Sequence, residues 1–272
     1  MYFKGENFFE ELSMPAAPKI IATRQTSVEA ENFLKTFIEW SKASDNNKSD
    51  AVPKKKPTIA ELKKTLREHG PSWKDWKYAV IIKVPVVKGK EKKEVKIFSD
   101  INLIQAFIFK KNLKKVKCIT ELALEKGQDF LDDLLKDKTE CLDLDGRTLP
   151  SNFSWICNAT TIHLATFWHV ESLAHFLEIS PHLKDIKTEF CKATPLHVAA
   201  SCDDETVAAS LLIRKGADAN ARMTNHQTPL HIAAQGGFIN TVITLLFEGN
   251  ADAMALNMAK SKLKYLICYF AL

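Results

Sequence analysis

The heptapeptide TPLHVAA at residues 194–200 returns as TPLHIAA at residues 228–234, and this near-identity decides the fold. The threonine that opens each copy can accept a hydrogen bond from the free backbone amides at a helix start. The proline after it occupies the first helical position, where a missing N–H costs nothing. The pattern therefore predicts two equivalent capped helices whose starts lie 34 residues apart.

A second apolar helix is expected after each copy. In the later unit its stripe follows the 3.6-residue period of a helix, and Gly249 is expected to end it with a left-handed backbone. The earlier unit has a matching stripe that ends at Gly216, followed by Ala-Asp-Ala-Asn. The positions that form the later stripe are Thr241, Val242, Leu245 and Leu246.

Thr-Pro-Leu-His-x-Ala at a period near 33, with a Gly-Ala-Asp-x-Asn loop at residues 216–220, resembles the ankyrin repeat. The resemblance implies stacked helix pairs that build a recognition surface and carry out no catalysis. It also implies that the motif histidines bond the backbone of the adjacent turn. The structural motif residues are Thr194, Pro195, Leu196, His197, Thr228, Pro229, Leu230, His231, Gly216 and Gly249.

Stacked repeats are not stable as a pair, so further units are expected beside these two. TTIHLA at residues 160–165 marks a third, degenerate repeat, and a DGRT turn at residues 145–148 suggests a starting unit with a short insertion. The C-terminal end is apolar on several sides, which suggests either a shortened form of a longer array or an edge for self-association. The expected array comprises 118–157 (degenerate), 158–192, 193–226, 227–257 and an incomplete end at 258–272.

The residues before this array differ in composition. Residues 42–117 contain 21 basic and 8 acidic residues, although the net charge of the whole chain is +5. Residues 1–57 are predicted to be a helix followed by a flexible basic linker, and residues 58–117 a small lysine-rich α+β region. Within that region we expect a capping box at 58–61 and a hairpin of 78–87 with 94–98. We also expect Pro85 to mark an edge strand and Ser99 to cap a helix over 101–113. The predicted fold is mainly α, an ankyrin-repeat solenoid of about three to four helix pairs behind this region.

Motifs for catalysis are missing from the sequence. It has no glycine-rich phosphate loop, no Gly-x-Ser-x-Gly and no pair of cysteines at metal-ligand spacing. We therefore expect no enzyme activity, no metal and no cofactor. The six scattered cysteines are typical of reduced thiols, and the first residues lack an apolar secretory segment. A cytoplasmic protein is expected. The basic cluster at residues 53–57 has the composition of a nuclear localisation signal, so a nuclear location is the alternative.

Partner binding is expected at the loop between the two best repeats and on the helices beside it. The partner would be one or more proteins held in the ankyrin groove. The alternative is a nucleic-acid-associated or membrane-surface adaptor that acts through the lysine-rich region, and salt dependence would separate the two. The candidate partner-binding residues that are expected to be exposed in the loop are Arg222, Met223, Thr224, Asn225, His226 and Gln227. The additional candidates in the groove are Ser201, Cys202, Asp203, Gln235 and Phe238.

Overall fold

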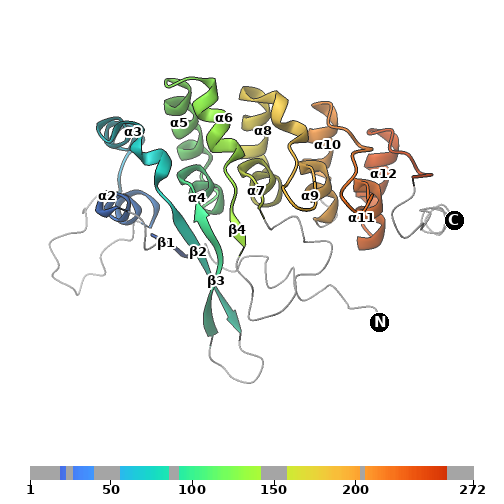
Figure 1. Cartoon of the computed structure of the whole chain (residues 1–272), viewed down its shortest axis with the longest axis horizontal. Coiled ribbons are helices and arrows are strands. Elements are labelled where there is room, and N and C mark those ends of the chain that lie inside the picture. The colour runs from blue at the N-terminus through green and yellow to red at the C-terminus, as the bar shows by residue number, and fades with distance from the viewer. Residues whose placement is uncertain are drawn as a thin grey trace. The chain divides into compact units, whose positions relative to one another are not determined.

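The computed structural model divides the chain into two compact units (Figure 1). The first comprises Met1–Leu134 with Thr139–Thr148, and the second comprises Leu135–Lys138 with Leu149–Leu272. The array was expected to begin at Cys118. In the structure the chain from Cys118 to Leu134 belongs to the first unit instead. The structure describes residues 19–22, 27–39, 56–85, 92–141, 158–202 and 206–255. The expected DGRT turn, the insertion after it and the C-terminal end lie outside these residues.

The first unit is built on a four-stranded antiparallel sheet in the order β1-β2-β3-β4. The expected hairpin is confirmed, because β2 pairs with β3 from Tyr78↔Ile101 to Pro85↔Lys92. The expectation that Pro85 marks an edge strand is wrong, because β2 lies between β1 and β3. Pro85 lies beyond the stretch of β2 that β1 covers, so a missing donor is tolerated there. The strands are β1 (Lys19–Ala22), β2 (Tyr78–Pro85), β3 (Lys92–Ile101) and β4 (Glu140–Cys141).

The helices of the first unit begin at side-chain caps that the sequence encodes. Thr58 and Glu61 form the expected capping box, and Ser27 caps the first described helix. The expected cap at Ser99 is wrong, because β3 continues through Ser99 to pair with β4, and Asn102 caps the following helix. These helices are α2 (Val28–Phe33), α3 (Ile59–Glu68), α4 (Leu103–Phe109), α5 (Leu113–Leu124) and α6 (Gln128–Lys136), with a π-helix at Leu34–Ile38 and a 3₁₀ helix at Gly70–Asp75.

The second unit is a stack of helix pairs. In Figure 1, α7, α9 and α11 form one row, while α8, α10 and α12 form the other. Each helix contacts its counterpart in the next pair: α9 contacts α7 and α11, and α10 contacts α8 and α12. The helices are α7 (Thr161–Trp168), α8 (Val170–Ile179), α9 (Pro195–Ser201), α10 (Val207–Arg214), α11 (Pro229–Gly236) and α12 (Ile239–Phe247), with a 3₁₀ helix at Pro181–Asp185.

The two expected helix-ending glycines have different roles. Gly216 has φ +78, the left-handed conformation that was predicted. The same prediction is wrong for Gly249, because the left-handed residue there is Asn250, with φ 49. Gly249 is instead required by packing: a Cβ atom on it would lie 2.8 Å from the Leu245 carbonyl oxygen and 3.1 Å from the Cβ atom of Ala219. Asn250 therefore supplies the left-handed residue of this turn.

The described helices are short. None of them combines the length and the apolar composition that a membrane crossing requires.

Candidate functional site

The capping histidines position the loops that join one helix pair to the next. His197 Nδ1 accepts the Thr194 N–H at 3.1 Å, so Nε2 carries the proton and donates to the Gln227 carbonyl oxygen at 3.2 Å. His163 bonds the Ala193 carbonyl oxygen in the same way, at 3.0 Å. The structural role implied for His197 is confirmed.

His231 departs from this pattern. Its Nδ1 accepts the Thr228 N–H at 3.2 Å, but its buried Nε2 has no hydrogen-bond partner among the described residues. The acceptors for His163 and His197 come from the residue before the next capping threonine. To make the equivalent bond, His231 Nε2 would need a backbone carbonyl oxygen from a unit that follows α12.

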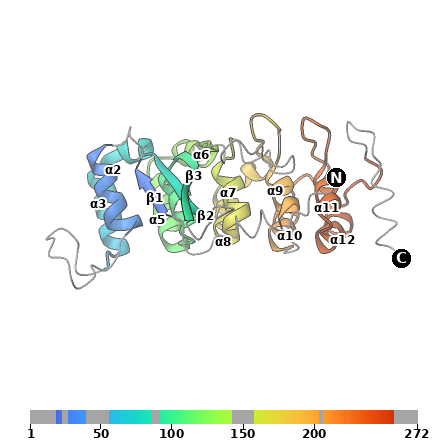
Figure 2. The same cartoon turned by 90° about the horizontal axis from the view of Figure 1, so that it is seen from below.

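Two loops, which we call finger 1 (residues 186–193) and finger 2 (residues 221–227), project on the same side of the array (Figure 2). Each is closed by a backbone hydrogen bond of 2.9 Å, from Thr188 N to Ala193 O in finger 1 and from Met223 N to Gln227 O in finger 2. A further bond of 2.9 Å, from Thr224 N to Cys191 O, ties finger 2 to finger 1. The two fingers are therefore held in a fixed register.

The turn of each finger contains one residue with a left-handed backbone, Lys192 at φ 57 and His226 at φ 62. In finger 2 the Asn225 side-chain oxygen accepts the Gln227 N–H at 3.1 Å, and this bond spans the left-handed residue His226. Finger 1 contains one more residue between its closing positions than finger 2 and keeps the same closure.

The predicted partner-binding residues differ in how much of each side chain is exposed to solvent. Met223 is buried in the apolar core, so the expectation that it is exposed is wrong. The groove candidate Ser201 is also buried, and its hydroxyl donates to the Val198 carbonyl oxygen at 2.8 Å. Asp203 lies outside the described residues. The exposed members are Arg222, Thr224, His226 and Gln235, and the half-buried ones are Cys202, Asn225, Gln227 and Phe238.

Finger 1 adds four exposed side chains that are not among the predicted partner-binding residues, namely Lys187, Glu189, Phe190 and Lys192. Phe190 is 67% exposed, which is unusual for an aromatic side chain in a structured loop. The signal that could have found Lys192 is its position two residues before a capping threonine, the position that His226 has in finger 2.

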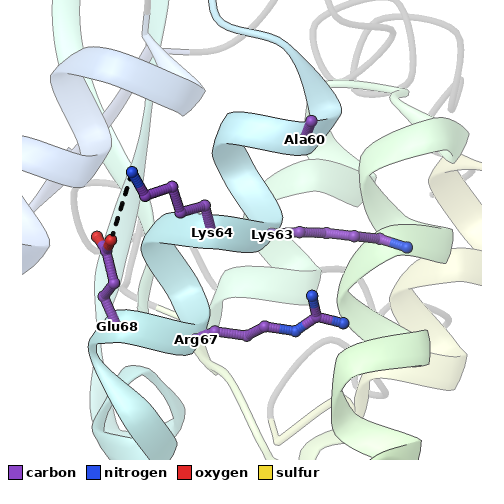
Figure 3. A pocket seen from close by; sticks show the side chains of 5 residues that line it. All are labelled: Ala60, Lys63, Lys64, Arg67 and Glu68. Carbon is purple, nitrogen blue, oxygen red and sulfur yellow. Dashed lines mark ion pairs between the residues drawn. The ribbon is translucent and has the colours of Figure 1, made fainter.

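The basic and aromatic side chains of the lysine-rich region are largely paired or buried. Three cations of α3 line an open depression (Figure 3), yet Lys63 and Arg67 are each paired at 2.7 Å, with Glu121 and Glu125 of α5. Trp73 and Trp76 are buried, so their rings are not available to stack on nucleic-acid bases. Within the described ranges, no group of three histidine, cysteine or acidic side chains is arranged to hold a metal ion.

Comparison with known proteins agrees with the geometry of the second unit. A family model for ankyrin repeats matches residues 157–257 in three copies. No curated protein sequence matches the chain.

Proposed function

Because residues 157–257 are ankyrin repeats, we propose that this chain is a protein–protein interaction module that binds its partner through fingers 1 and 2 and the adjacent ends of α9 and α11. The observation that carries the proposal is the shared closure and direct linkage of the two fingers, which presents their side chains in register. We also propose that the array has no catalytic activity and acts as a scaffold. We further propose that the chain acts in the cytoplasm or the nucleus, where the buried thiols of Cys118 and Cys191 stay reduced.

Site-specific photo-crosslinking tests this proposal in the full-length chain. A benzophenone side chain placed at Phe190 or Thr224 should crosslink to the partner inside cells. The same group at Val207, on α10, serves as the control, because that position is also exposed but belongs to the other row of helices. Mass spectrometry of the conjugates identifies the partner. Equal yields from α10 and the fingers, or conjugates from α10 alone, would contradict the assignment of the binding surface.

A double substitution tests finger 2 more directly. Arg222→Glu with His226→Ala should weaken binding of the crosslinked partner about tenfold, because both side chains are exposed and neither lies in the core. The helical content measured by circular dichroism should stay the same. Retained affinity would show that finger 2 is not part of the interface.

A second proposal concerns self-association through the end of the array. Ile239, Ile243 and Phe247 are exposed along one stripe of α12, at spacings of four residues, and Phe247 is 81% exposed. Exposed apolar stripes often mark protein contacts. Ile243→Lys with Phe247→Lys should shift sedimentation velocity profiles at high concentration toward monomer. Unchanged profiles would contradict this contact.

The alternative of a nucleic-acid or membrane-surface adaptor is less well supported by the described contacts. The ion pairs that link α3 to α5 neutralise two of the cations available on that face. If lysine substitutions in residues 58–117 abolish a salt-sensitive interaction while finger substitutions do not, the adaptor function replaces the one proposed here.

A further inference from the structure

The repeat array separates its charges along the sequence. The segments that contain the fingers and the helices after them, residues 186–201 and 220–237, hold three Lys or Arg residues and one acidic residue. The segments that contain the other row of helices, residues 170–185, 203–218 and 238–252, hold nine acidic and three basic residues. The finger side of the array is therefore basic in an array that is acidic elsewhere.

The cations of the two fingers occupy equivalent positions. Lys187 precedes Thr188, the residue that closes finger 1, and Arg222 precedes Met223, the residue that closes finger 2. On the returning arms, Lys192 and His226 share the left-handed position described above. All four side chains are exposed.

Glu189 is the single acidic residue of the two fingers, and it forms an ion pair with another residue of the array. Glu189 pairs with Lys138 at 2.8 Å, and this partner lowers the pKa of the Glu189 carboxyl group. Lys192 also lowers this pKa, so Glu189 lies near one finger cation, and the two fingers hold three Lys or Arg side chains against this one carboxylate. The next residue, Phe190, exposes 67% of its surface.

We infer that fingers 1 and 2 bind an extended acidic segment of a partner protein, with an apolar side chain of that segment lying against Phe190. The inference rests on the proposed function and names the chemistry of the partner. Stacked helices lie about 8–10 Å apart, so cations in successive fingers recur at about that distance. In the polyproline II conformation an extended chain rises about 3.1 Å per residue and has three residues per turn, so carboxylates three residues apart lie on one face at about that spacing.

A protein segment fits this surface better than a nucleic acid does. Three permanent charges neutralise few phosphates, whereas nucleic-acid binding generally depends on many such contacts. An exposed phenylalanine beside cations suits a segment that alternates acidic and apolar residues.

The test measures binding of synthetic peptides to the full-length chain by fluorescence anisotropy. The peptide EALEALE has carboxylates at the inferred spacing. QALQALQ lacks the charge, and EEEALAL keeps the composition but loses the spacing. We expect EALEALE to bind at least tenfold more tightly than either of the others at low salt. Equal binding of QALQALQ would overturn the acidic partner, and equal binding of EEEALAL would overturn the two-finger register.

Matched charge reversals locate the binding surface. Lys187→Glu with Arg222→Glu should weaken EALEALE binding about tenfold or more, and Lys192→Gln with His226→Gln should weaken it several-fold. The control, Arg214→Glu with Lys215→Glu at the end of α10, reverses the same number of exposed charges and should leave binding unchanged. An equal loss in the control would overturn the inference. Melting curves of each variant show that the array remains folded.

Two further outcomes separate this inference from the proposed function. If a DNA duplex competes with EALEALE and binds more tightly, and the finger reversals abolish that binding, the acidic protein segment is overturned. If EALEALE does not bind while photo-crosslinks from Phe190 and Thr224 persist, the finger surface binds a partner of other chemistry. In that case the proposed function stands and the inference fails.

Discussion

The two copies of the heptapeptide, residues 194–200 and 228–234, fold alike locally and differ in what surrounds them. In both, the capping threonine hydroxyl lies 2.8 Å from Nδ1 of the motif histidine. The difference is at Nε2, where His197 reaches the Gln227 carbonyl oxygen and His231 has no partner among the described residues.

The comparison shows that the motif encodes the cap by itself, whereas the second bond is supplied by the unit that follows. A buried polar atom without a partner costs about 1–3 kcal/mol. Each repeat is therefore completed by its successor, which is the physical reason that such arrays are cooperative. The following predictions test this difference.

The largest effect is expected from a charge in the core of either copy. Leu196 and Leu230 are fully buried, and Leu196→Asp or Leu230→Asp should lower the free energy of unfolding by about 3–5 kcal/mol, because each leaves a buried unpaired charge. The loss should be greater at Leu196, since α9 packs between α7 and α11. Urea unfolding of both variants measures this. An unchanged melting temperature in either variant would contradict the repeat assignment.

The next effect is a loss of stability at mildly acidic pH. Burial lowers the pKa of His163 and His197 to about 4, with the Ala193 and Gln227 carbonyls opposing the shift. An unfolded histidine titrates near 6.5, so the unfolded chain takes up protons first as the pH falls. Stability is therefore complete above about pH 6.5 and declines toward pH 4.

Between pH 7 and pH 5 the expected loss is about 2 kcal/mol for each of these histidines. Urea titrations at the two pH values measure it. His197→Gln should remove no more than about half of the pH dependence, because the imidazoles of His163 and His231 remain buried with lowered pKa values. A variant with the pH dependence of the natural chain would show that His197 does not titrate as a buried group.

The array could be predicted from sequence because its signals are local. The capping threonine, the proline and the histidine act within one helical turn, and their roles at residues 194–197 follow from residue type alone. Finger 2 was identified for the same reason. The burial of Met223 was missed because it depends on the helices packed beneath the finger. Finger 1 was passed over because its loop lacks the family pattern, although Lys192 and His226 stand at equivalent positions.

The first unit could be predicted only in part, because its sheet depends on long-range pairing. The β2–β3 hairpin and the cap at Thr58 are local and are confirmed. Strands β1 and β4 are four and two residues long, too short to give a pattern, and each joins the sheet through a distant partner. Pairing with β4 extends β3 past Ser99, which moves the helix start to Asn102.

The smallest effect isolates the bond that distinguishes the two copies. Glutamine at the third helical position can still accept the N–H of the capping residue, so His197→Gln and His231→Gln should both retain the capping box. The substitution at position 197 also removes the donor to the Gln227 carbonyl oxygen, whereas His231 has no such bond among the described residues to lose. His197→Gln should therefore destabilise the array by about 1 kcal/mol more than His231→Gln, as measured by urea unfolding at pH 7.5, where both histidines are neutral. Equal losses would mean that the bond to Gln227 adds nothing to stability, or that a unit beyond α12 completes His231 as finger 2 completes His197.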